Sequence, residues 1–197
     1  SGLPTGIWTL NPGGIRGTRT TAIITRLNPG IANFTVTNSL GCTSNPSLNF
    51  VINPQPAMAV PLPQVVCNNS MTQPLIFTSN NTGGTTIYNW TNSDPSIGLS
   101  ASGSGNIPSF IAVNYGTSPI VSTITVTPTF INGGISCTDA STTFTITVNP
   151  SGQVNQATSQ VVCSGSTTTA VLFSTYNTSG TTTYSWVNSD PSIGLAA

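Results

Sequence analysis

Few residues in this chain could do chemistry, and two of its three aspartates, Asp94 and Asp190, lie in a duplicated stretch. The stretch reads NSDPSIGL and occupies residues 92–99 and 188–195. Two carboxylates held close together can act as acid and base, and one carboxylate among several other oxygens can hold Ca²⁺. Because each copy supplies a single carboxylate, and the copies belong to different predicted domains, a catalytic pair is not expected.

The composition removes most other chemistry. The 197 residues include no Lys, Glu or His, and charged residues make up 3% of the chain. General acid–base catalysis usually draws on those side chains, and neither a Ser-His-Asp set nor a His/Cys zinc cluster can be assembled without them. We therefore expect a protein that is not an enzyme and that needs no cofactor or metal ion.

The basic residues are equally sparse and argue against a nucleic-acid partner. Arg16, Arg19 and Arg26 carry all the positive side-chain charge, whereas binding to a phosphate backbone draws on many Lys and Arg contacts. We interpret these three as solvated side chains on a loop. No apolar run reaches the roughly eighteen residues that a spanning helix needs, and no signal peptide opens the sequence, so any export signal is expected outside these residues.

Period-two patterns predict β-strands. Residues 143–148 read TFTITV and residues 123–127 read TITVT, which places apolar side chains on one face and hydroxyls on the other. Fifteen Pro and nineteen Gly punctuate such runs, as expected for an all-β chain. The predicted strands of the best-defined region lie near residues 59–66, 74–79, 85–91, 97–101, 108–114, 120–130 and 141–149.

An internal repeat organises the chain. Residues 160–195 match residues 64–99 at 22 of 36 positions without a gap, at an offset of 96 residues. That period is the size of one β-sandwich domain, with two antiparallel sheets packed face to face. We therefore predict three parts: residues 1–53 as the end of one immunoglobulin-like sandwich, 54–149 as a complete sandwich, and 150–197 as the first half of another, in a longer protein.

The repeated stretch is interpreted as a turn. Asn, Ser, Asp and Pro favour turns, and Pro95 disfavours a helical conformation at Asp94, as Pro191 does at Asp190. The stretch thus predicts a strand end, a turn and a new strand start. Calcium binding through each aspartate is the alternative.

Three tryptophans are predicted in the cores, namely Trp8, Trp90 and Trp186. Trp90 and Trp186 each lie two residues after a Tyr, so in a strand both aromatic side chains face the same way. The alternative, an exposed platform on which sugars stack, requires several aromatic residues on one outer face.

Cysteine parity suggests one disulfide per domain. Cys67 and Cys137 fall in the complete domain and are predicted to pair, whereas Cys42 and Cys163 would pair outside these residues. Disulfides imply an oxidising or extracellular setting. The alternative is free thiols that pack as small apolar groups.

The combined pattern QVVC…YxWxNSDPSIGL…ITVTPT…C…TFTITVNP resembles the PKD-like repeats of giant cell-surface adhesins of Bacteroidetes. Residues 1–44 resemble a second immunoglobulin-like repeat of those proteins. The resemblance covers nearly the whole chain, and it implies tandem PKD-like sandwiches arranged as a rod. PKD domains proper carry a WDFGDG-like motif, whereas Trp90 is followed here by TNSD, so the resemblance implies a similar fold without shared ligand chemistry.

The resemblance also implies a function, a location and partners. Proteins of this kind leave the cell through type IX secretion, stand anchored on the outer membrane as filaments, and serve gliding motility and attachment. The expected partners are neighbouring repeats, the secretion and motility machinery, and a substratum or glycans bound through other parts of the protein. We expect a structural stalk; the alternatives are a glycan- or surface-binding module and an accessory domain of a secreted hydrolase.

Overall fold

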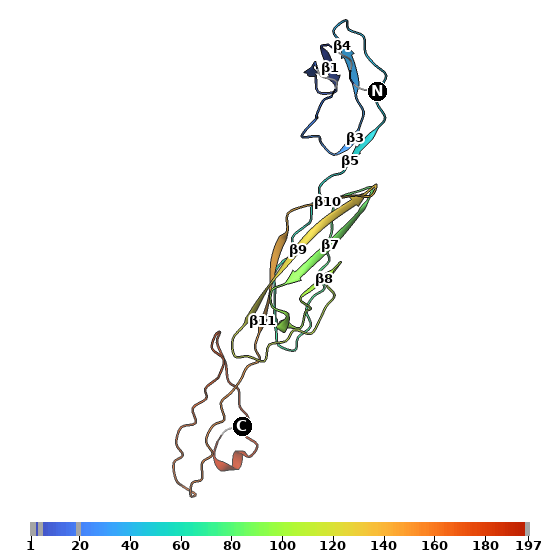
Figure 1. Cartoon of the computed structure of the whole chain (residues 1–197). Coiled ribbons are helices and arrows are strands. Elements are labelled where there is room, and N and C mark those ends of the chain that lie inside the picture. The colour runs from blue at the N-terminus through green and yellow to red at the C-terminus, as the bar shows by residue number, and fades with distance from the viewer. Residues whose placement is uncertain (1–2, 4–5, 19–20, 196–197) are drawn as a thin grey trace. The chain divides into compact units, whose positions relative to one another are not determined.

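The computed structural model describes residue 3 and residues 6–18 and 21–195, and this part of the chain is all-β (Figure 1). Two one-turn 3-10 segments, η1 (Pro95–Ile97) and η2 (Pro191–Ile193), interrupt the extended chain. The strands are β1 (Trp8–Asn11), β2 (Ile15–Gly17), β3 (Gly30–Ala32), β4 (Thr35–Asn38), β5 (Phe50–Ile52), β6 (Gln64–Cys67), β7 (Thr85–Asn92), β8 (Ser102–Ser104), β9 (Ile120–Asn132), β10 (Ile135–Thr138) and β11 (Thr142–Asn149). Arg19 lies outside the described residues.

The chain forms two compact units. One comprises Ser1–Ala59, Thr78–Tyr88 and Thr127–Ala140, and the other comprises Val60–Phe77, Asn89–Val126 and Ser141–Ala197. Strands β7 and β9 contribute residues to both units, so the units do not follow the repeat. The division of the chain at residues 53 and 149 stays a prediction.

The first unit holds two small sheets. One has the strand order β2-β1-β4, and the other pairs β3 with β5. Trp8 of β1 is 2% exposed and lies directly opposite Gly17 of β2. A Cβ at Gly17 would lie 2.5 Å from Cζ2 of Trp8, so the missing side chain makes room for the indole. The rings of Phe34 and Phe50 stack with their centroids 5.1 Å apart.

The larger sheet has the order β6-β11-β9-β7-β8, and β10 also pairs with β9. β9 pairs with β11 over residues 120–126 and with β10 over residues 129–132. Pro128 lies at the break between these two partners, where a strand can tolerate a residue without an N–H donor. β6 pairs with β11 in parallel, so the prediction of purely antiparallel sheets is wrong for this edge.

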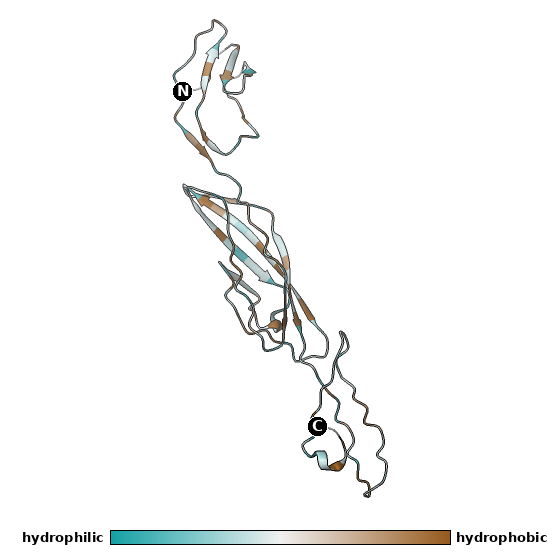
Figure 2. Cartoon of the chain, turned by 180° about the vertical axis from the view of Figure 1, so that it is seen from behind, coloured by the Kyte–Doolittle hydropathy of each residue, from teal (hydrophilic) through white to brown (hydrophobic). Residues whose placement is uncertain are grey.

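Hydrophobic residues alternate with more hydrophilic ones along the long strands (Figure 2), and the hydrophobic ones build the core of the second unit. Phe144, Ile146 and Val148 of β11 are buried, while the threonines between them are half-buried. A second layer faces them, in which residues 69–75 run antiparallel to residues 107–112 through backbone hydrogen bonds. The rings of Phe77 and Phe144 meet at 6.4 Å between centroids. This two-layer arrangement is consistent with a β-sandwich.

Three predicted strands are not formed as continuous strands. Residues 74–79 and 108–114 pair only through isolated bridges, and residues 97–101 follow a 3-10 turn instead of opening a strand. Ile97 and Leu99 are nevertheless buried, at 0% and 8% exposure. The period-two pattern therefore identified buried positions correctly, while turn geometry decided how the backbone was paired.

Residues 150–190 contain no strand, although they repeat a region that does (Figure 1). In the first copy, β7 forms a ladder with β8 and β9, and β6 with β11. The counterparts of β6 and β7 in the second copy are thus not paired as strands in the described residues.

Candidate functional site

The duplicated stretch forms a capped turn in its first copy. Residues Pro95–Ile97 make the single turn η1, and Asp94 precedes it in an extended conformation. Oδ1 of Asp94 accepts a hydrogen bond from the Ser96 backbone N–H at 3.0 Å. The carboxylate therefore caps the turn, and Pro95 occupies the first position, where its fixed φ fits and no N–H is needed.

A buried asparagine ties this turn to the sheet. Nδ2 of Asn92 donates to the Leu99 carbonyl at 2.9 Å, and its Oδ1 accepts from the Asp94 N–H at 3.2 Å. The hydroxyl of Ser122 on β9 donates to the same Oδ1 and accepts from the Asp94 N–H at 3.1 Å. Asn92 and Ser122 are 7% and 0% exposed, so these bonds satisfy polar groups that water does not reach.

The second copy repeats the local contacts. Nδ2 of Asn188 donates to the Leu195 carbonyl at 2.7 Å, and Oδ1 of Asp190 accepts from the Ser192 N–H at 3.0 Å. The hydrogen bonds from Ser192 lower the pKa of the fully exposed Asp190 carboxyl. A turn with the same contacts thus forms without the equivalent of β9.

The two repeated aspartates are used within their own turns. Among residues 3, 6–18 and 21–195, no three His, Cys, Asp or Glu side chains gather where a metal ion could be held. Asp94 and Asp190 each cap a backbone turn, and Ca²⁺ usually takes six to eight oxygen ligands, several of them carboxylates.

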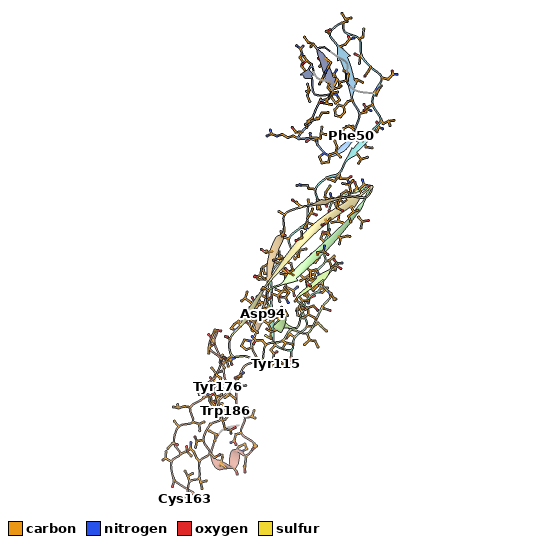
Figure 3. All side chains as sticks on the ribbon, in the orientation of Figure 1. Phe50, Asp94, Tyr115, Cys163, Tyr176 and Trp186 are labelled. Atoms are coloured by element: carbon orange, nitrogen blue, oxygen red, sulfur yellow. The ribbon has the colours of Figure 1, made fainter. Side chains whose placement is uncertain are left out.

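The tryptophans fall into two groups. Trp8 and Trp90 are buried, at 2% and 7% exposure, and each lies opposite a glycine on the neighbouring strand. A Cβ at Gly103 would lie 2.7 Å from Cε2 of Trp90 and would overlap its six-membered ring. Trp186 is 50% exposed (Figure 3), so its predicted core position is not formed among the described residues and stays a prediction.

The predicted disulfide is wrong. Cys42, Cys67, Cys137 and Cys163 are all free thiols. Cys67 pairs with Asn149 at the end of β11 that lies beside Ile120, whereas Cys137 pairs with Phe130 ten residues further along β9. Ten strand residues span about 33 Å, and disulfide partners need Cα atoms within about 7 Å.

An asparagine clasp holds the segment that follows Pro54. Oδ1 of Asn81 accepts from the Ala57 N–H at 3.2 Å, and its Nδ2 donates to the Gln55 carbonyl at 3.1 Å. The Ser79 hydroxyl bonds Asn81 Oδ1 and accepts from the Asn81 N–H at 3.1 Å. One side chain thus fixes two backbone positions of this segment, which is called the link below.

The clasp recurs 96 residues later. Oδ1 of Asn177 accepts from the Gln153 N–H at 2.8 Å, its Nδ2 donates to the Ser151 carbonyl at 3.1 Å, and Thr175 takes the place of Ser79. Sequence reasoning missed these asparagines. The signal that could have found them is identity: Asn81 and Asn177 match at the offset of 96 residues, and each is followed by a Thr.

Comparisons with known proteins add no assignment: no family model matches the chain, and a search of curated proteins finds no significant match. Within the described ranges, none of the helical segments has the length and apolar character required to span a bilayer.

Proposed function

We propose that this chain is a structural stalk segment of a very large cell-surface adhesin, built from PKD-like and immunoglobulin-like sandwiches in series. The proposal includes export by type IX secretion, an outer-membrane location and a role in gliding motility and attachment. It rests on the resemblance described above and on the physical features below.

The observation that carries the proposal is the repetition of contacts whose effect is architectural. The NSDPSIGL turn and the asparagine clasp recur at one offset of 96 residues, with the same donors and acceptors. The residues shared between the copies therefore hold turns and links. They do not assemble a group that could transfer a proton or bind an ion.

The outer strand faces favour the same reading. Thr143, Thr145 and Thr147 alternate with the buried residues of β11, and hydroxyls are hydrated without charge. Contacts made by such a surface should depend little on salt, because there are few charges to screen. A spacer that stands in a variable medium benefits from that property.

A glycan- or surface-binding function is the second candidate, and two exposed aromatics favour it. Tyr115 and Tyr176 are 80% and 62% exposed (Figure 3). Their loops are joined by a hydrogen bond from the Thr178 N–H to the Thr117 carbonyl. Sugars stack on such rings, although a single pair is a small platform.

A glycan array separates the two candidates. The full chain and a Tyr115→Ala/Tyr176→Ala variant would be screened side by side. The stalk proposal expects no specific signal from either protein. Specific binding by the wild type that the double variant loses would replace the stalk with a binding function. Antibody labelling of intact cells tests the location: a signal only after permeabilisation contradicts a surface protein.

A further inference from the structure

The loop of residues 114–118 is organised by one buried side chain, that of Asn114. Asn114 is 1% exposed. Its N–H donates to Oδ1 of Asn68 at 2.8 Å, and its Nδ2 donates to the carbonyls of Ser118 and Val148 at 2.8 and 2.7 Å. Its Oδ1 accepts from the Gly116 N–H at 2.9 Å. Every polar atom of this amide is used, so the loop has one defined shape.

The ordered loop presents two carbonyls to the second copy of the repeat. Thr117 accepts from both the N–H and the hydroxyl of Thr178, at 2.9 and 3.3 Å. Gly116 accepts from Nε2 of Gln153 at 3.4 Å. Thr178 directly follows Asn177 of the clasp, so the loop contacts the element that holds the link.

Asn68 makes further hydrogen bonds at the link of the second copy, which follows Pro150. Asn68 donates its N–H to the Asn149 carbonyl at 2.8 Å and its Nδ2 to the Ser151 hydroxyl at 3.1 Å. Since Asn68 also accepts from Asn114, the bonds and the chain between them form a closed ring. The ring runs through residues 68, 114, 116–117, 178, 177 and 151 and returns to Asn68.

We propose that the loop of residues 114–118 is a docking surface for the following repeat, and that Asn114 is its positioning residue. Its partner is a repeat that carries a threonine directly after its clasp asparagine, because that residue supplies two donors to one carbonyl. The complete repeat carries the same pair as Asn81-Thr82. A short Pro-containing link without such docking would act only as a semi-rigid spacer. This inference deepens the stalk function proposed above and rests on it.

The amide of residue 178 reports on the docked state. In the full wild-type chain, we expect its hydrogen exchange, followed by NMR, to be slower than that of a solvated amide by about tenfold or more, as one structural hydrogen bond allows. Asn114→Ala should restore fast exchange at position 178. The Asn155 amide, which bonds the Ser174 carbonyl at 2.9 Å within the second copy, should be unaffected.

If Asn114→Ala unfolds the protein, the amide of Ile146 in the core will also exchange faster. A milder variant separates loss of docking from such unfolding. Thr178→Val with Gln153→Ala removes only exposed side-chain donors and should raise exchange at position 178 several-fold while Ile146 stays protected. Fast exchange at position 178 in the wild type overturns the proposal, and so does equal protection in the wild type and the milder variant. Neither outcome depends on whether the chain binds glycans, so a failure here is distinct from a failure of the stalk function.

Discussion

Residues 64–99 and 160–195 are two copies of one sequence in two different environments. In the first copy, Phe77, Tyr88 and Trp90 are buried at 5%, 8% and 7% exposure. Their counterparts Phe173, Tyr184 and Trp186 are 42%, 38% and 50% exposed. The turn and the clasp form in both copies, whereas the strands and the core form only where β8, β9 and β11 cover them. Local contacts in this protein thus depend on short motifs, while burial depends on the second half of the repeat.

The largest expected effect comes from filling the space under a buried tryptophan. Gly103→Ala places a Cβ against the Trp90 ring, and overpacking of this kind costs about 1–3 kcal/mol or more. Chemical denaturation should show a correspondingly lower free energy of unfolding. Gly152→Ala is the matched control, because a Cβ at Gly152 would meet nothing within 4 Å. Equal stability of the two variants would contradict the packing of Trp90 on β8.

The equivalent asparagines Asn92 and Asn188 can be replaced in turn, and the two losses of stability can be compared. Asn92→Ala leaves the buried Leu99 carbonyl without its donor and removes one of the hydrogen bonds of the Ser122 hydroxyl, and we expect a loss of about 1–3 kcal/mol. Asn188→Ala removes an exposed bond to Leu195 and should cost about 0.5 kcal/mol or less. Thermal unfolding of both variants measures the difference. If Asn188→Ala proved as damaging as Asn92→Ala, burial would not explain the contrast.

Alkaline pH tests the burial of Tyr88 in the first copy. Burial raises the pKa of Tyr88 above its usual value of 10, and a hydrogen bond from Ser79 opposes this shift in part. The unfolded chain therefore ionises first, so the stability from this residue is complete below about pH 10 and is lost as the pH rises further. Tyr88→Phe should flatten the decline of melting temperature above pH 10. The same decline in both proteins would show that Tyr88 is not its cause.

The smallest effect is expected at the cysteines. Cys67 on β6 lies level with the start of β9, whereas Cys137 on β10 pairs near the end of β9. Cys137→Ser should therefore change the free energy of unfolding of the oxidised protein by less than about 1 kcal/mol, as measured by thermal unfolding. Thiol titration of the unfolded wild type should find four free groups. A clear destabilisation that disappears under reducing conditions would restore the bridge.

Sequence reasoning succeeded where the signal was periodic or local. The alternation of residues 143–148 identified the buried face of β11, and the residue types of NSDPSIGL identified a turn. It failed where the outcome depends on distant chain segments. Cysteine parity carries no information on which ends of strands meet, and the parallel pairing of β6 with β11 leaves no mark on residue order. Asn114 had no sequence signal, because its role comes from three backbone groups and the Asn68 side chain that the fold brings around it.

The central claim is that the 96-residue repeat is one β module whose second half completes its first. The most direct test appends a copy of residues 102–149 after Ala197, which supplies the second copy with the strands that cover the first. The tryptophans would carry a fluorine label for NMR, with Trp186→Phe assigning the signal. We expect the Trp186 resonance to lose its solvent sensitivity and to resemble that of Trp90. A Trp186 signal that stays as solvent-exposed as in the original chain would contradict the account.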